Sequence, residues 1–544
     1  MKARQFLNWR VMLILCHRWM GIAFGLLFLM WFVSGVAFVY WGMPNVSPGE
    51  RMDRQAEIDL SSAAIAPSEA ASRHNLRPGR LTVAMQDGRP TYRFGQSAVY
   101  ADTGELVRRS PVDADAAVEV VRRWVPEHAA TIRYGQYLVD SDQWTLQSAQ
   151  RSQMPVHRIA VGDERDTYYY VAERTGEIVM KTDRASRLKG FASGVLHWVY
   201  FTPLRKHGYA WNQFIVWSSF AGALMCLLGL VLGLQRLSPR AKFRRRGKPV
   251  HSPYSGLLGW HHYSGLLFGL ISFTWVLSGG FSVNPFGMFA GGSGLSAAQR
   301  NVISGGPFDV ARVELDALKE GAARLAEHFP IKEIDVLQFR GDLYLTATRP
   351  PSEREPVPAG GPPERRMISL THPERGTFTR FDAAVMDEIA DEIMVGVPVR
   401  DRQWLYSYDH YYRSRDGARP LPVLRVRYED ERGTWLYFDP HTGSVSLLHR
   451  QNRVRRWLYN ALHELDIPYI YERRPLWDIL VIGLSIGGIV LAGTTLWPGF
   501  KRIGRHLRRF GRRLSSRARP RAAGIPLEVT ARRSQDAKPA GSRS

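Results

Sequence analysis

Residues 17–25, HRWMGIAFG, open the first long apolar segment of this chain. The 24 residues from Trp19 to Gly42 carry no charged side chain and are mostly apolar. About 20 such residues form a helix long enough to cross the hydrocarbon core of a bilayer. Similar runs follow at about 211–234, 256–283 and 479–498. Because each run is this long, the sequence predicts a membrane protein with four transmembrane helices rather than four buried core helices.

The positive charge of the chain gathers in three segments. The net charge is +23, and residues 1–10, 235–249 and 501–544, together with Arg18, account for all of it. A nucleic-acid-binding domain would present its basic residues on one folded face, so this distribution argues against nucleic acid as a partner. Four spans place all three segments on one side, and basic loops stay in the cytoplasm. We therefore expect a multi-pass protein with both termini cytoplasmic and its arginine-rich tail attached to anionic membrane lipid.

The chain also contains an internal duplication. Spans one and three align at an offset of 244 residues, and spans two and four align at an offset of 266. The residues repeated at the first offset are His17, Gly21, Gly25, Trp31, Ser34 and Gly35, which match His261, Gly265, Gly269, Trp275, Ser278 and Gly279. Those repeated at the second are Leu196, His197, Trp211, Ser219 and Gly222, which match Leu462, His463, Trp477, Ser485 and Gly488. Parallel repeats are related by an axis along the membrane normal, so equivalent residues should face each other.

The two long segments outside the spans show an α+β pattern. Polar turns that end at Gly104, Gly176 and Gly443, with a degenerate fourth at Gly376, follow β-rich stretches and predict hairpins with glycine at positive φ. Helical stretches at 113–127 and 309–328 complete about four small α+β units, two in each segment. The expected parts are a first span with its N-terminal segment (1–43), an outside domain (44–188), an interfacial segment with span two (189–235), a basic loop (236–254), span three (255–288), a second outside domain (289–452), an interfacial segment with span four (453–500), and a basic, disordered tail (501–544).

Of the 16 histidines, His17 and His261 stand at the same depth of spans one and three. An ionisable residue at membrane depth is costly and marks a functional site by default. Each is followed by glycine at i+4 and i+8, which clears one helix face for a close neighbour or a flat ligand. Two imidazoles that face each other across an axis suit axial ligation of a heme iron. For a single histidine, a hydrogen bond between packed helices is the simpler interpretation.

A different metal site is the competing interpretation of this pair. Zinc would need further ligands from Cys, Asp or Glu, and spans one and three offer none nearby. The two cysteines, Cys16 and Cys226, lie in apolar runs, which argues against a disulfide scaffold and against a Cys-ligated zinc or iron–sulfur site.

His197 and His463 precede spans two and four in stretches that are typical of amphipathic segments at the outer interface. By the same symmetry they form a second candidate pair, although each could simply cap its segment. Neither His262 nor His207 is repeated, so both are secondary candidates. Further candidates are Trp31 and Trp275, between the two levels, as packing partners of the ligand or of lipid, and Arg18, Arg455 and Arg456 as partners of heme propionates or of lipid phosphate.

These features resemble the PepSY-associated transmembrane helix family, which includes iron-regulated inner-membrane proteins and ferric-siderophore reductases of Gram-negative bacteria. The resemblance rests on HRWMGIAFG, HHYSGLLFG, the two Leu-His segments before spans two and four, and the D-x-T-G-E-type turns of PepSY modules. It covers nearly the whole chain up to about residue 505. The stretch GVLHWVYFTPLRKHG, which lacks the usual glycine spacing, and the long basic tail depart from the family pattern.

The resemblance implies a heme-containing oxidoreductase of the bacterial inner membrane with two PepSY-like periplasmic domains. The family's ligands would carry over to His17, His261, His197 and His463, as axial ligands of two bis-histidine heme b groups. Electrons would pass to ferric iron in the periplasm, often held in a siderophore or another ferric chelate. The chain has no G-x-G-x-x-G after a predicted strand, so the donor would be quinol or a cytoplasmic reductase.

A second function from a different class stays open. The outside units could restrain a periplasmic peptidase or bind a ligand, with the helices as a membrane anchor and no redox activity. That hypothesis leaves the paired intramembrane histidines unexplained.

Overall fold

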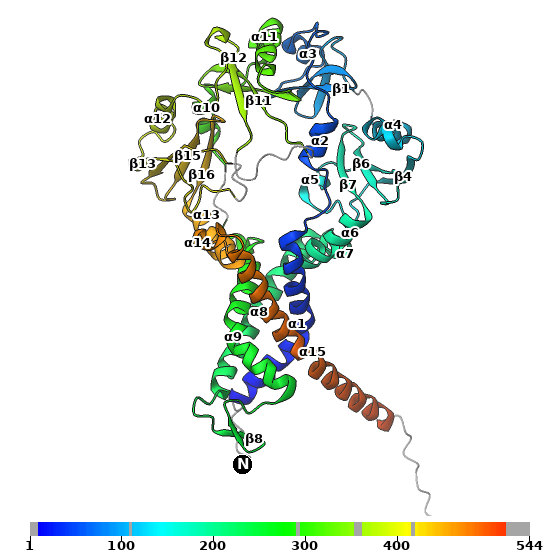
Figure 1. Cartoon of the computed structure of the whole chain (residues 1–544), viewed down its shortest axis with the longest axis vertical. Coiled ribbons are helices and arrows are strands. Elements are labelled where there is room, and N and C mark those ends of the chain that lie inside the picture. The colour runs from blue at the N-terminus through cyan, green and yellow to red at the C-terminus, as the bar shows by residue number, and fades with distance from the viewer. Residues whose placement is uncertain (1–8, 108–110, 290–293, 353–361, 415–418, 518–544) are drawn as a thin grey trace, which may run out of the picture.

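The computed structural model describes residues 9–107, 111–289, 294–352, 362–414 and 419–517. Figure 1 shows the long helices bundled at one end of the molecule and the β-sheets at the other. The basic hairpin β8 (Phe243–Arg245) and β9 (Lys248–Val250) lies at the far end of the bundle from the sheets. We call this the basic end and the opposite one the sheet end.

The bundle consists of α1 (Trp9–Tyr40), α8 (Gly208–Arg236), α9 (Gly256–Phe281) and α15 (Leu476–Arg517). All four are long and apolar enough to span a membrane. Each helix packs against two others: α1 against α8 and α15, and α9 against the same two. The helices therefore form a closed ring, with α1 and α9 on one diagonal and α8 and α15 on the other.

The tail differs from its prediction. We expected residues 501–544 to be disordered, but residues 501–517 continue α15 as helix. Arginine, lysine and leucine are good helix formers, and a helix already nucleated by the span extends at little cost. The remainder of that expectation, residues 518–544, lies outside the described residues.

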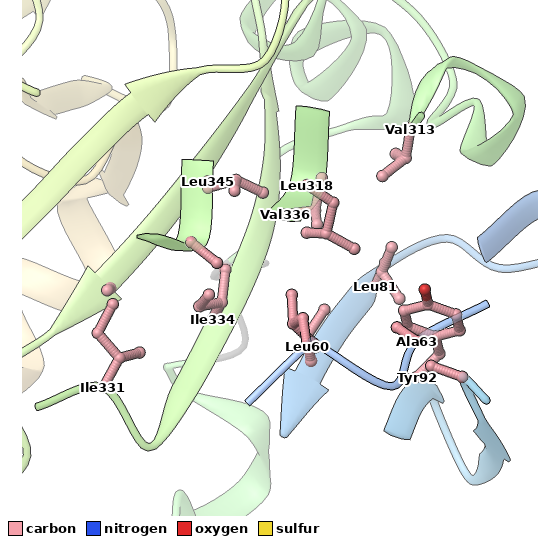
Figure 2. Packing of buried hydrophobic residues seen from close by; sticks show 14 of the residues in the cluster. Leu60, Ala63, Leu81, Tyr92, Val313, Leu318, Ile331, Ile334, Val336 and Leu345 are labelled. Carbon is pink, nitrogen blue, oxygen red and sulfur yellow. The ribbon is translucent and has the colours of Figure 1, made fainter. Parts of the chain in front are cut away.

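The first units of the two outside segments share one antiparallel sheet, in the order β12-β11-β10-β1-β2-β3. Its strands are β1 (Leu81–Gln86), β2 (Arg89–Phe94), β3 (Ser97–Tyr100), β10 (Glu333–Phe339), β11 (Asp342–Thr348) and β12 (Arg365–Ser369). We expected one domain in each segment, but β1 pairs with β10, with Leu81 opposite Val336, and joins them. Figure 2 shows the core beneath this junction, where Leu60, Tyr92 and Leu318 from both segments are buried together.

Two four-stranded sheets complete the sheet end, one in each half. The first contains β4 (Arg133–Leu138), β5 (Val156–Ala160), β6 (Tyr168–Ala172) and β7 (Ile178–Thr182), and the second contains β13 (Val399–Leu405), β14 (Val423–Tyr428), β15 (Trp435–Asp439) and β16 (Ser444–Leu448). Helices α4 (Ala114–Trp124) and α11 (Leu315–Ala326) fall within the two predicted helical stretches. The prediction for the glycine turns is confirmed, because Gly104, Gly176, Gly376 and Gly443 all have positive φ.

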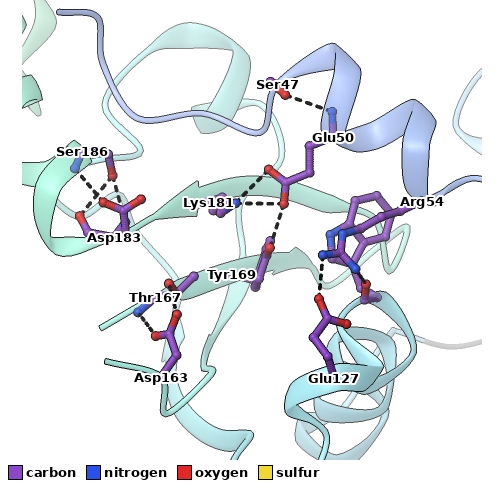
Figure 3. A network of polar contacts seen from close by, with 11 residues as sticks. Ser47, Glu50, Arg54, Glu127, Asp163, Thr167, Tyr169, Lys181, Asp183 and Ser186 are labelled. Atoms are coloured by element: carbon purple, nitrogen blue, oxygen red, sulfur yellow. Dashed lines mark hydrogen bonds and ion pairs between the residues drawn. The ribbon is translucent and has the colours of Figure 1, made fainter. Parts of the chain in front are cut away.

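A buried polar network ties the bundle to the first of these sheets (Figure 3). Glu50 in α2 (Pro48–Arg54) accepts hydrogen bonds from Tyr169 Oη at 2.8 Å and from Lys181 Nζ at 2.9 Å. Asp183 caps α6 (Arg184–Gly190) by accepting from the Ser186 amide at 2.7 Å. Since α2 follows α1 and α6 leads toward α8, the network fixes where both spans meet the sheet.

The remaining short helices are α3 (Pro67–Arg73), η1 (Pro126–His128), α5 (Ser148–Arg151), η2 (Phe191–Val195), α7 (Thr202–Arg205), η3 (Pro285–Gly287), α10 (Ala297–Ser304), η4 (Val310–Arg312), η5 (Pro373–Arg375), α12 (Ala383–Glu392), α13 (Arg450–Arg455), η6 (Arg456–Ala461) and α14 (Pro468–Tyr471).

Candidate functional site

The structure brings His17 and His261 together across the bundle. Their ring centroids are 6.2 Å apart, with the ring planes tilted by 35°. His17 Nδ1 lies 3.0 Å from the Met225 carbonyl oxygen of α8, and His261 Nδ1 lies 3.3 Å from the Leu491 carbonyl oxygen of α15. A carbonyl only accepts, so each Nδ1 carries the hydrogen and each Nε2 keeps its lone pair. Met225 and Leu491 are themselves equivalent at the offset of 266.

His197 and His463 form a second pair near the sheet end, with ring centroids 6.0 Å apart and planes tilted by 48°. His463 Nδ1 donates to the Trp275 carbonyl at 3.0 Å and lies 3.3 Å from Ser278 Oγ. In the other half His197 Nδ1 lies 3.3 Å from Ser34 Oγ, and the Trp31 carbonyl is a hydrogen-bond partner of the same ring. The partners of the two rings are therefore the same two repeated positions.

The separation within both pairs fits two imidazoles on opposite sides of one metal ion. A histidine nitrogen binds a metal at about 2 Å, and the ring centre lies about 1 Å behind it, so two such rings have centres about 6 Å apart. Among the described residues no group of three or more His, Cys, Asp and Glu is placed to hold an ion. Two protein ligands are what an iron needs when a porphyrin supplies its other four bonds.

The basic-end pair lies in a cavity of about 600 Å³, a size typical of cofactor sites. The predicted glycines Gly21, Gly25, Gly265 and Gly269 line it. A side chain at Gly229, also in the lining, would put its Cβ only 2.6 Å from His17 Cε1. The lining also includes five cations and no acid: Arg18, Arg236, Lys501, Arg502 and Arg505.

The sheet-end pair lies in a second cavity, of about 510 Å³. Aromatic rings from both halves line it: Trp31, Phe38, Trp198, Tyr200, Trp211, Trp275, Tyr459, Tyr471 and Trp477. Its lining holds no Lys or Arg, and Glu464 is its acid. The Trp275 indole N–H is buried and has no hydrogen-bond partner within the described part of the chain. An unpaired donor in an apolar cavity is consistent with a site shaped for a ligand.

Two phenylalanines separate the cavities, because Phe28 and Phe32 line both. The repeated glycines make room for them: a Cβ at Gly222 would lie 2.8 Å from Phe28, and one at Gly488 would lie 2.4 Å from Phe32. The sequence placed Trp31 and Trp275 between the levels, but they line only the sheet-end cavity. In the sequence, the repeat of Gly222 and Gly488 is the signal for the close packing of Phe28 and Phe32 between the two cavities.

Of the secondary candidates, Arg18 and His262 line the basic-end cavity, and Trp31 and Trp275 line the sheet-end cavity, whereas His207, Arg455 and Arg456 line neither. His262 contacts Ser252 Oγ and the Gly233 carbonyl at 2.9 Å each, so both ring nitrogens are used in helix packing. His207 is exposed at the start of α8 and lines neither cavity. Arg456 donates to the carbonyls of His410 and Asp466, and Arg455 stacks 5.3 Å from the Tyr459 ring. Neither arginine lines the sheet-end cavity.

The backbone around the sheet-end pair is unusual in both halves. The π-helical turns η2 and η6 precede the two histidines, and such turns are rare and frequent at functional sites. Two residues after each histidine, Val199 and Leu465 have φ of +55° and +50°. A bulky residue in this left-handed region is strained and persists only where the surroundings hold it. Sequence reasoning missed both residues because neither is a glycine or asparagine, although they are equivalent at the offset of 266.

No protein-family model and no curated protein matched the chain.

Proposed function

We propose that this chain is a two-heme membrane oxidoreductase that carries electrons across the bilayer. His17 and His261 would hold one heme b in the basic-end cavity, and His197 and His463 would hold the other in the sheet-end cavity. One observation carries the proposal: each pair joins two histidines that are equivalent in the duplication, and the carbonyls that accept hydrogen bonds from the two rings are equivalent as well. Hydrogen bonds of this kind fix the tautomer and orientation of a metal-binding imidazole.

The placement of the two pairs suits transfer along the membrane normal. His17 and Ser34, which contacts the sheet-end pair, are 17 residues apart on α1. At 1.5 Å per residue the two levels are about 25 Å apart, close to the thickness of a hydrocarbon core. Bound heme would supply one-electron chemistry, while the chain orients the imidazoles, lines both cavities mostly with apolar side chains and separates them with Phe28 and Phe32.

The direction follows from charge. Basic segments favour the cytoplasmic side, so the basic end would lie inside and the sheets in the periplasm of a bacterial inner membrane. The electron donor would be quinol or a cytoplasmic reductase. The acceptor would be ferric iron in a siderophore or other chelate outside. The sheets then correspond to PepSY-like domains.

The decisive experiment is a heme count on the purified protein and on matched variants. The wild-type chain should bind two hemes, with Soret and α bands that shift on reduction by dithionite. His261→Ala should remove the basic-end heme and His463→Ala the sheet-end heme, whereas His207→Ala, outside both cavities, should keep two. A well-folded preparation without heme would contradict the proposal and favour a non-redox binding or regulatory module anchored in the membrane.

The acceptor requires a second assay. Inverted vesicles that enclose a ferric chelate should reduce it when quinol, or NADH with cytosol, is added outside. Both His261→Ala and His463→Ala should abolish this reduction, because each breaks the path at one level.

A further inference from the structure

Helix α15 is too long for all of it to lie within the bilayer core. The part of α15 from Leu476 to Phe510 has 35 residues. At 1.5 Å per residue they extend about 50 Å, against a hydrocarbon core about 30 Å thick. Pro498 lies inside the helix and cannot donate the hydrogen bond that a residue there would make to the Thr494 carbonyl. A proline of this kind bends a helix, and Figure 1 shows the last turns of α15 leaving the bundle.

The segment beyond this proline, residues 500–510, has two distinct faces. Phe500, Ile503, Leu507 and Phe510 recur at helical spacing and lie on one side. Their exposed fractions are 59%, 37%, 66% and 63%, so the rest of the protein does not cover them. The other side carries Lys501, Arg502, Arg505, Arg508 and Arg509, and the segment contains no acidic residue.

Within the described part of the chain, the cations of this segment lack an acidic counter-ion. Among the residues that the structure describes, none of the five forms an ion pair with an acidic side chain. His506, from the same segment, packs its ring 5.2 Å from the ring of Trp19 on α1, near the basic end of the bundle. An uncovered apolar stripe beside unpaired cations, at the end of a transmembrane helix, is the pattern of a helix that lies in a membrane surface.

We propose that residues 500–510 form a surface helix that binds anionic phospholipid at the basic end of the bundle. The apolar stripe enters the boundary between headgroups and acyl chains, and the arginines bind the headgroup phosphates as charge-assisted donors. Arg508 and Arg509 line neither cavity, so lipid binding by these two residues can be tested apart from the redox function. The consequence of lipid binding is a fixed depth and rotation of α15, the helix that supplies the Leu491 carbonyl to His261.

A nitroxide scan of the full-length protein in vesicles tests this placement. Exposed Cys16 is replaced by Ser, buried Cys226 is kept, and single cysteines at positions 502 to 510 are labelled in turn. In vesicles of phosphatidylglycerol, oxygen should collide most with labels at 503, 507 and 510, and a water-soluble nickel chelate most with labels at 502, 505 and 509. High nickel accessibility at every position would mean that the helix projects into water. Shielding of the apolar positions from both reagents would mean that it packs on protein. Either result overturns the proposal.

A charge variant tests the lipid class. Each cation near an anionic surface contributes roughly a fivefold factor, so Arg508→Gln with Arg509→Gln should weaken surface binding roughly 25-fold. The double variant in phosphatidylglycerol, and the unchanged chain in phosphatidylcholine, should both lose the oxygen peaks. Arg244→Gln with Arg245→Gln, in the β8–β9 hairpin, removes the same charge and should leave the peaks in place. An equal depth in both lipids would show that anionic headgroups are not what the segment binds. The heme content of the two double variants, measured in parallel, should not change, because none of the four arginines lines a cavity.

Discussion

The two cavities hold their histidines in the same way but differ in the charge around them. In each, both rings have a carbonyl of a neighbouring helix as a hydrogen-bond partner, and the two carbonyls lie at equivalent positions of the two halves. Five cations line the basic-end cavity, whereas the sheet-end cavity is aromatic and includes Glu464. Of those cations only Arg236 and Arg502 are equivalent, and Glu464 corresponds to Trp198. The histidine pairs are thus built from residues that recur in both halves. The charge around each pair comes mostly from residues that do not recur.

The largest expected effect comes from filling the glycines that touch the imidazoles. An added Cβ would lie 2.6 Å from the His17 ring at Gly229, 3.1 Å from His463 at Gly279 and 3.4 Å from His197 at Gly35. Gly229→Ala should therefore displace His17 and lose the basic-end heme, Gly279→Ala should weaken the sheet-end heme, and Gly35→Ala should keep both. The measurement is the heme count for each purified variant.

Gly21→Ala is the matched control, because its Cβ would meet nothing closer than the Met225 sulfur at 3.9 Å. Alanine is also a better helix former than glycine, so helix stability alone would improve in all four variants. Equal heme content in Gly229→Ala and Gly21→Ala would mean that His17 does not hold a ligand in the position described.

How far the sequence predicts this molecule depends on whether the signal is local. The spans and the histidine pairs follow from apolar runs and from constant offsets, both visible in the residues themselves. The pairing of β1 with β10 was not predictable, because it joins strands about 250 residues apart through backbone groups that any edge strand offers. The positive φ of Val199 was not predictable either, because valine disfavours this region and tertiary packing imposes it.

The charge difference between the cavities should appear in their reduction potentials. A cation near a redox centre favours the form with the extra electron, by an amount on the order of 1 kcal/mol per charge, or about 40 mV for a one-electron couple. Arg236→Gln with Arg502→Gln should thus lower the midpoint potential of the basic-end heme by several tens of millivolts. The sheet-end heme should not shift, because neither arginine lines its cavity.

A redox titration followed at the Soret band resolves the two potentials, and His463→Ala in the same background assigns them. Lys242→Gln with Arg244→Gln, in and beside the β8–β9 hairpin, is the control for general loss of positive charge. Equal shifts in both hemes would show that the cations act over the whole bundle rather than on one cavity.

The smallest expected effect concerns the helices that lead into the sheet-end pair. Asp183 caps α6 in the first half, and His449 caps α13 at the equivalent position of the second. Burial lowers the pKa of His449 below its ordinary value of 6.5, helped by the charges of Arg432 and Arg453 and opposed by Asp430. As pH falls below about 6.5, the unfolded chain therefore takes up this proton before the folded chain does. The contribution of the cap to stability is then lost progressively as the pH approaches the lower pKa of the folded state.

Thermal unfolding followed at pH 7.5 and pH 5.5 should show this loss in the wild-type chain. His449→Asn keeps a side chain that can cap the helix but cannot take up the proton, so its melting temperature should fall less over the same interval. Asp183→Asn is the matched control, because it changes the equivalent cap in the first half without removing a histidine. If the melting temperature of His449→Asn falls as much as that of the wild-type chain, the pH dependence of stability does not come from His449. The two caps would then stabilise their helices in the same way.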